Sequence, residues 1–264
     1  MTKKILKWTG FGLAGLLALW LVGSLYLTSQ ASALVFNNAV SWAPVPNFGY
    51  ELTFIENSAK QSVSVWEFNP AAEAADSELV ILYLHGNSGR INDMFPELTK
   101  YGRVYSPAYP GYHESEGQPD TESVYDTALT AYDWLVETEG VDEENIIIFG
   151  HSMGGSPATH VAANRPNARR LVLANTFSSI QSMCYRDYSI LCVFAGGILN
   201  TAEQAGKVTI PVRHFAYKGD LDVPYEENQK LFEYFTGTRD KEFVTMERYT
   251  HTYPDFTALG TAFN

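Results

Sequence analysis

Two hydrophobic patterns divide this chain. The segment Gly10–Leu27 is apolar on every side and lacks the polar face of an amphipathic helix. From about residue 50 onward, short apolar runs alternate with amphipathic stretches instead. The change predicts an apolar N-terminal segment followed by a globular part with its own core.

The N-terminal segment has the features of a membrane helix. Lys3, Lys4 and Lys7 precede it, and its length approaches the ~20 residues that a membrane-spanning helix needs. A signal-peptide core is usually shorter, about 7–15 residues, so length favours an uncleaved anchor. Ala31-Ser32-Ala33 fits a signal-peptidase site, which leaves a secreted or periplasmic product as the alternative. The lysines predict a cytoplasmic N-terminus, with the remaining chain on the non-cytoplasmic side in both cases.

The rest of the chain has the pattern of a mixed α/β protein. Residues 50–55 and 62–68 alternate as edge strands do, whereas later runs such as Leu79–Leu84 are apolar throughout, as in a strand covered on both faces. The other strands are expected at Arg103–Ala108, Asn145–Phe149, Arg170–Ala174, Thr209–Tyr217 and Glu242–Arg248, and helices at Thr121–Glu139, Met153–Asn164 and Tyr225–Tyr234. This order predicts a mostly parallel sheet with helices on both faces.

The expected domain organisation follows from these patterns. Residues 1–33 form the anchor or signal segment, 34–48 a tether containing Pro44 and Pro46, and 49–264 a single α/β domain. The segment 177–207 interrupts the alternation of strands and helices with aromatic residues and glycines. It is expected to form a small cap over the sheet.

Composition narrows the classes of partner. The formal net charge of −12 repels phosphate backbones, so nucleic acid is not an expected partner. Cys184 and Cys192 lie in no CxxC pair and near no metal-spaced histidine, so neither a metal nor another cofactor is predicted. A disulfide and two buried thiols both remain open for this pair, and the oligomeric state is not indicated.

The first chemical motif is Gly150-His151-Ser152-Met153-Gly154, which matches G-x-S-x-G between a predicted buried strand and a predicted helix. The chain must turn sharply there to expose the serine hydroxyl, and glycine at the flanks leaves room for the turn. Ser152 is therefore the candidate nucleophile. The amide of Met153 is a candidate donor to an oxyanion. Pro157 removes an amide early in the predicted helix and is the one irregular feature.

The second motif is His85-Gly86-Asn87-Ser88-Gly89, directly after the predicted strand Leu79–Leu84. A glycine-rich turn in this place presents a backbone amide, and that of Asn87 is the candidate for a second oxyanion donor. His85 is interpreted as a structural histidine that anchors the turn.

A serine nucleophile needs a base, and on this type of fold the chain order is serine, acid, histidine. His251 follows the last predicted strand and satisfies the order, whereas His214 lies inside a strand and before the acid. Asp220 and Asp222 both follow the strand Thr209–Tyr217, so either could orient His251. The other would be a loop or helix-capping carboxylate.

These motifs together resemble the α/β-hydrolase superfamily, and specifically the Bem46-like group with a serine-aminopeptidase (S33) type of fold. The resemblance rests on LYLHGNSG, YPGYHESEG, GHSMGG, GDLDVP and His251, which run from about residue 80 to 251. It implies an α/β-hydrolase fold and the triad Ser152, Asp220 and His251, because the family's acid stands three residues before Val-Pro. The chain departs from the family at Ala108, where Asp is usual, and at His113, where Gly is usual, which leaves substrate preference open.

The implied function is hydrolysis of a carboxylic ester or thioester through an acyl-enzyme intermediate, as in a carboxylesterase, without metal or organic cofactor. Expected partners are a small-molecule ester or acyl substrate and a membrane bound through the N-terminal segment. An acyltransferase or a peptidase would use the same triad. A non-catalytic membrane-tethered binding protein on the same scaffold is the remaining alternative.

Overall fold

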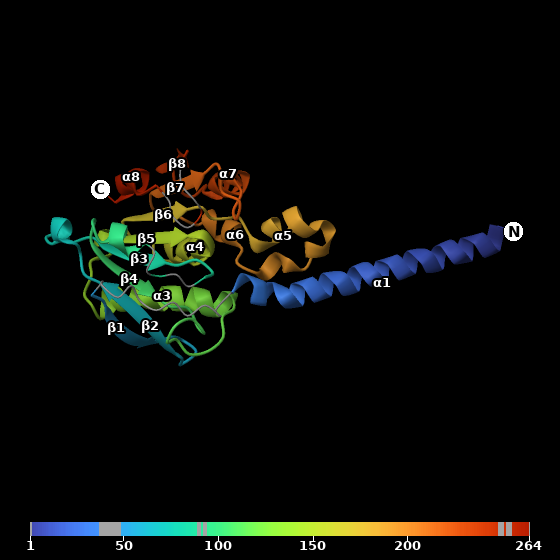
Figure 1. Cartoon of the computed structure of the whole chain (residues 1–264), viewed down its shortest axis with the longest axis horizontal. Helices are drawn as coiled ribbons and strands as arrows, with labels where there is room; N and C mark the ends of the chain where they lie inside the picture. The colour runs from blue at the N-terminus through green and yellow to red at the C-terminus, as the bar shows by residue number, and fades with distance from the viewer. Residues whose placement is uncertain are drawn as a thin grey trace.

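An eight-stranded sheet forms the centre of the structure, a computed structural model that describes residues 2–36, 49–88, 91, 94–247, 251 and 255–263 (Figure 1). The strand order is β1-β2-β4-β3-β5-β6-β7-β8. β2 pairs antiparallel with both β1 and β4, and the strands from β4 to β8 are parallel. The α/β-hydrolase architecture is therefore confirmed. Most of the predicted tether, residues 37–48, lies outside the described residues.

The strands lie close to their predicted positions. They are β1 Glu51–Glu56, β2 Ser62–Phe68, β3 Val80–Leu84, β4 Arg103–Pro107, β5 Ile146–His151, β6 Arg170–Ala174, β7 Val212–Tyr217 and β8 Lys241–Met246. β3 and β5 are buried along their whole length, as their continuous apolar runs predict. β7 begins three residues later than predicted, directly after Pro211, which has no N–H to donate to a neighbouring strand.

Helices cover the sheet on both faces (Figure 1). α3 (Thr121–Glu137) begins at a capping box, in which the Asp120 carboxylate accepts from the Ser123 amide and the Ser123 side chain accepts from the Asp120 amide. α4 (Gly155–Asn164) begins later than the predicted Met153, because a 3-10 turn at Ser152–Gly154 precedes it. Pro157 thus lies in the first turn of α4, where amides lack helical acceptors anyway. α7 (Tyr225–Tyr234) matches its prediction, whereas the short α2 (Phe95–Leu98) and α8 (Phe256–Leu259) were not expected.

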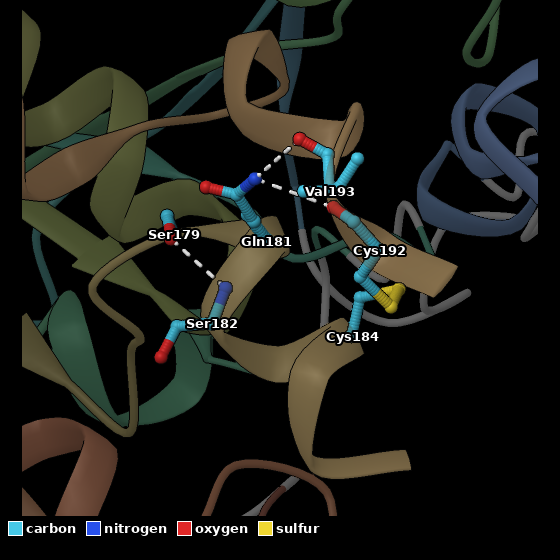
Figure 2. Close-up of a disulfide and its surroundings, with 6 residues drawn as sticks. All are labelled: Ser179, Gln181, Ser182, Cys184, Cys192 and Val193. Atoms are coloured by element: carbon cyan, nitrogen blue, oxygen red, sulfur yellow. Dashed lines mark hydrogen bonds between the residues drawn. A yellow bond between two sulfur atoms is a disulfide. The ribbon is translucent and has the colours of Figure 1, made fainter. Parts of the chain in front are cut away.

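The segment after β6 leaves the sheet and forms short helices between the sheet and the N-terminal helix (Figure 1). These are α5 (Ile180–Tyr188), the 3-10 turns Ser189–Cys192 and Ala195–Gly197, and α6 (Thr201–Ala205). A disulfide joins Cys184 to Cys192 across this segment, which decides between the two alternatives left open for the cysteines (Figure 2). The Glu227 carboxylate of α7 accepts from the hydroxyls of Ser178 and Ser182 and ties the start of the segment to the α/β body.

The N-terminal helix α1 (Thr2–Val35) extends far from the α/β body (Figure 1). Gly12–Gln30 is long and apolar enough to cross a membrane, a test that a signal sequence also passes. Most of its described side chains are exposed, but one stripe at helical spacing is at least partly covered: Trp20, Gly23, Ser24, Leu27 and Thr28. This stripe faces the 3-10 turn Ser189–Cys192, so α1 contacts the segment after β6.

Candidate active site

Ser152 lies at the carboxyl end of β5, in a backbone conformation that few residues adopt. Its φ is 55°, in the left-handed region, and its side chain is largely buried. A non-glycine residue is strained there, and such strain persists only where the surroundings enforce it. The sharp turn directs the hydroxyl away from the strand, as the G-x-S-x-G motif predicts.

The glycines of this motif are required by close packing. A Cβ on Gly150 would lie 2.6 Å from the Cβ of Ala158 and from backbone atoms of Gly154 and Gly155. A Cβ on Gly154 would collide with the carbonyl oxygen of Leu84 at the end of β3. The turn therefore closes only because both positions lack a side chain.

A hydrogen-bonded chain joins Ser152 to a histidine and an aspartate. His251 Nε2 lies 2.8 Å from Ser152 Oγ, and His251 Nδ1 lies 2.6 Å from Asp220 Oδ2. The other oxygen of Asp220 accepts from the amides of Asp222 and Val223, both at 2.9 Å. Asp220 is buried, whereas Asp222 is exposed. Of the two candidate acids, the structure brings Asp220 to the imidazole.

Parallel strands explain why these distant residues meet. Leu84 of β3 pairs with Gly150 of β5, and Tyr217 of β7 pairs with Met246 of β8. The segments that follow these strands therefore emerge at one edge of the sheet.

The same carboxylates and imidazole satisfy the distance requirement for a metal site. Among the described residues, ligand atoms of Asp220, Asp222 and His251 lie within 4.8 Å of one another. Both nitrogens of His251 already contact Ser152 and Asp220, so coordination would require breaking one of these contacts. The arrangement therefore suits proton transfer better than metal binding.

The turn after β3 lies directly beside Ser152. A Cβ on Gly86 would be 3.4 Å from the Cβ of Ser152 and 3.8 Å from its Oγ, so the turn passes in van der Waals contact with the serine. Two buried tyrosines hold it: Tyr109 donates to the carbonyl of His85 and Tyr112 to the carbonyl of Asn87. The predicted donors Asn87 and Met153 thus come from the two segments that flank the hydroxyl.

His85 has the structural surroundings that its position in the turn predicts. Its Nδ1 donates to the carbonyl of Gly86 at 2.8 Å, and its ring packs at 4.1 Å against the tilted ring of Tyr109. Burial lowers the pKa of His85 to about 3, so the ring is neutral at physiological pH. Near this turn, His113 has a φ of 46°, a conformation that favours glycine and accounts for the family preference at that position.

His151 is a feature that the motif alone does not reveal. Its Nε2 donates to the backbone carbonyl of His251 at 2.7 Å, and the two imidazole rings lie 5.1 Å apart. Burial, with a smaller contribution from the charge of His251, lowers the pKa of His151 to about 3. A neutral His151 therefore fixes the backbone of the histidine that contacts Ser152. The sequence signal is only a histidine at the variable position of the motif.

Two buried asparagines support the same edge of the sheet. The side-chain oxygen of Asn175 accepts from the amide of Tyr217, just before the turn that carries Asp220. The side-chain oxygen of Asn228 accepts from the amide of Thr176 and from His214 Nε2. These contacts tie β6, β7 and α7 together. Asn175 could have been noticed as a polar residue directly after a buried strand.

Comparison with known families agrees with this architecture. The model of the alpha/beta hydrolase family matches residues 81–260, which include Ser152, Asp220 and His251. The chain belongs to the alpha/beta hydrolase family.

Similar proteins place this hydrolase among Bem46-like relatives, as its motifs predict. It is 26% identical to Protein bem46 of Schizosaccharomyces pombe, over 98% of this chain and 90% of that protein. It is 28% identical to lysophosphatidylserine lipase ABHD12 of Danio rerio, over 65% of this chain and 55% of that protein.

Solved structures share the fold of this hydrolase. An esterase from Pyrococcus furiosus superposes with a TM-score of 0.66 and 17% identity, covering 84% of this chain and 93% of that chain. An alpha-beta hydrolase from Vibrio vulnificus has a TM-score of 0.71 at 19% identity, covering 89% of both chains.

Proposed function

We propose that this protein is a serine hydrolase that cleaves a carboxylic ester or thioester through an acyl-enzyme intermediate. The observation that carries the proposal is the chain of contacts from Ser152 Oγ through His251 to Asp220, at 2.8 and 2.6 Å. Both distances lie within hydrogen-bond reach, which is the first requirement for a nucleophile, its base and the group that orients the base.

The first half of the reaction forms the acyl enzyme. Ser152 Oγ attacks the acyl carbonyl while its proton passes to His251 Nε2. The Asp220 carboxylate accepts from His251 Nδ1, holds the tautomer whose Nε2 is free to take that proton, and stabilises the imidazolium. The tetrahedral intermediate then collapses, the alcohol or thiol leaves with the proton from His251, and the acyl group stays on Ser152.

The second half releases the acid. Water attacks the acyl carbon as His251 takes its proton, and the Ser152 oxygen leaves as the proton returns to it. In both halves the amides of Met153 and Asn87 would stabilise the oxyanion, each donor contributing roughly 3 kcal/mol. Ester chemistry is supported by the names of similar proteins, which include an esterase and a lipase.

A fluorophosphonate probe tests this proposal directly. When the full-length protein is incubated with the probe, the rate of hydrolysis of a p-nitrophenyl ester should fall in proportion to the fraction of protein labelled. Peptide mass spectrometry should find the adduct on Ser152. Product analysis with an added alcohol separates hydrolysis from acyl transfer, because a transferase would form a new ester in place of the acid. Loss of hydrolysis with the adduct on another residue would refute the assignment.

His151 provides a prediction about positioning. His151→Leu removes the donor to the carbonyl of His251. Loss of one buried hydrogen bond costs about 1–3 kcal/mol, so we expect kcat to fall about 5- to 160-fold. KM should change little, because His151 contacts the backbone of His251.

His151→Gln serves as the matched variant, because its amide keeps a donor of similar reach. It should recover a large part of kcat, provided that both variants unfold at the temperature of the parent. Full activity in His151→Leu would show that the contact has no positioning role.

We further propose that α1 is an uncleaved anchor and that the α/β domain faces the non-cytoplasmic side. α1 is helical without a break through Ala31-Ser32-Ala33, and its last residue Val35 and the following Phe36 pack on the core of the domain. The disulfide between Cys184 and Cys192 supports an oxidising compartment.

The mature protein should accordingly begin at or near Met1 and stay with membranes in high salt. N-terminal sequencing of protein purified from membranes measures the first point, and sedimentation after a salt wash the second. A mature chain that begins at about Leu34 would show a signal peptide instead.

A further inference from the structure

Three of the seven exposed large apolar side chains described outside α1 lie close together in sequence on the segment after β6. Tyr185, Val193 and Phe194 are 42%, 41% and 44% exposed, and two of them are consecutive. The other exposed large apolar residues described outside α1 are scattered: Tyr50, Phe54, Leu221 and Tyr234. We call Tyr185, Leu191, Val193 and Phe194, with the disulfide Cys184–Cys192, the cap apex. An exposed apolar cluster of this kind marks a contact surface.

The cap apex lies against α1. The rings of Trp20 and Phe194 are 6.2 Å apart, and a Cβ on Gly23 would lie 3.5 Å from Leu191 Cδ2. Gly23 and the fully buried Ser24 allow the close approach, as small residues do between membrane helices. On its uncovered faces α1 exposes Leu13, Leu16, Leu17, Leu19, Val22 and Leu25. The exposed apolar residues of the cap apex thus adjoin those of α1, and the segment that carries them lies beside α1 (Figure 1).

The height of this contact along α1 decides what surrounds the cap apex. From Lys7 to Trp20 the helix rises through 13 residue steps, which is about 20 Å at 1.5 Å per residue. The hydrocarbon core of a bilayer is about 30 Å thick. If Lys7 lies at the cytoplasmic surface, Trp20 is roughly 10 Å and Gly23 roughly 6 Å below the opposite surface. A tilt of α1 would place both still deeper.

Two backbone carbonyls of the cap apex have a partner within the protein, as an apolar environment favours. The Gln181 side-chain amide donates to the carbonyl of Cys192 at 3.2 Å and to that of Val193 at 3.0 Å (Figure 2). Irregular backbone at membrane depth is costly unless its polar groups find protein partners. Gln181 therefore covers carbonyls that the 3-10 turn leaves without helical donors.

We propose that the cap apex is embedded in the outer half of the lipid bilayer beside α1, at the depth of an interfacial element. The bilayer is thus its partner, and the disulfide keeps the embedded turn closed. α6, at the other end of the cap, packs on α4, which follows the 3-10 turn of Ser152, so the cap links the leaflet to the active site. With this placement, the substrate is an ester whose acyl chain is dissolved in the leaflet. This statement about the substrate rests on the proposed function.

Photo-crosslinking of the full-length protein in phosphatidylcholine vesicles tests the placement without any activity. p-Benzoylphenylalanine is introduced at Phe194, at Phe54 of β1 as a similarly exposed control, and at Leu17 of α1 as a reference for lipid contact. After irradiation, mass spectrometry should find phosphatidylcholine adducts at positions 194 and 17 and none at 54.

Every other result of the crosslinking experiment contradicts a specific part of the inference. Adducts at 17 but not at 194 would place the cap apex outside the bilayer. Absence of adducts at 17 would refute membrane insertion of α1, and with it the inference. Equal adducts at 54 and 194 would show that the cap apex has no particular contact with lipid.

An activity measurement separates this inference from the proposed function. Phe194→Glu should lower hydrolysis of a long-chain acyl ester presented in vesicles about tenfold, because a charge is costly at that depth. Hydrolysis of a water-soluble short-chain ester should stay within about twofold, and Phe54→Glu should change neither rate. Equal rates of Phe194→Glu and parent on the vesicle ester would overturn the inference. Absence of hydrolysis in the parent itself would refute the proposed function instead.

Discussion

Ser152→Ala is expected to lose ester hydrolysis and probe labelling together, with a fall in kcat of about 10⁴-fold or more. The substitution removes the oxygen that forms the acyl enzyme, which lies 2.8 Å from His251 Nε2. The residual rate would come from substrate binding and oxyanion stabilisation alone. Alanine has less side-chain bulk than serine, so the turn at φ 55° keeps its packing.

The measurement is single-turnover and steady-state kinetics on a p-nitrophenyl ester, with thermal unfolding as a check on the fold. Ser58→Ala is the matched control, since the Ser58 side chain is more exposed than that of Ser152 and lies on a turn remote from His251. It should label and hydrolyse like the parent. A folded Ser152→Ala protein that retains labelling would transfer the nucleophile to another residue.

Asp220→Asn is expected to lower kcat by about 10⁴-fold, because the structure dictates how the new amide would sit. The amides of Asp222 and Val223 donate to Asp220 Oδ1, so the oxygen of an asparagine must stay there. Its NH₂ group then faces His251 Nδ1 and donates to it. The imidazole is forced into the tautomer that carries its proton on Nε2, and this tautomer is unable to accept the proton of Ser152.

Asp222→Asn is the matched control, because it makes the same chemical change two residues away on an exposed side chain. Its backbone amide still donates to residue 220, so kcat should stay within about threefold of the parent. Paired kinetics on folded proteins measure the ranking. A larger loss in Asp222→Asn would assign the acid to Asp222, and large losses in both would indicate a shared carboxylate pair.

Local patterns were enough for most of the sheet. β3, the first four residues of β5 and residues 171–174 of β6 are apolar runs that are buried, and such runs have few alternative structures. Boundaries were less predictable, because the start of α4 depends on the 3-10 turn that Ser152 and its flanking glycines form. The start of β7 depends likewise on the pairing that Pro211 prevents.

The sequence predicted that segment 177–207 interrupts the alternation of strands and helices, but it did not predict the structure of this segment. Its aromatic residues and glycines have no strong periodicity, and the spacing of two cysteines does not decide whether they pair. Their disulfide depends on the fold of α5 and the turn after it, which brings the two Cα atoms to 5.7 Å. The contact of this segment with α1 joins residues far apart in the chain, and no local pattern indicates it.

By itself, the sequence determined the α/β class of this protein, its family, the apolar N-terminal helix and the few residues from which a hydrolytic site could be built. Each of these depends on periodicity or on a short motif, and therefore on neighbours in the chain. The family resemblance favoured Asp220 over Asp222, but only the tertiary structure shows the contact of Asp220 with His251. Only the tertiary structure, likewise, shows that His151 holds the backbone of His251 and that the cap apex lies on α1. These contacts depend on which segments emerge at the same edge of the sheet and on distances of a few ångströms, which spacing along the chain does not determine.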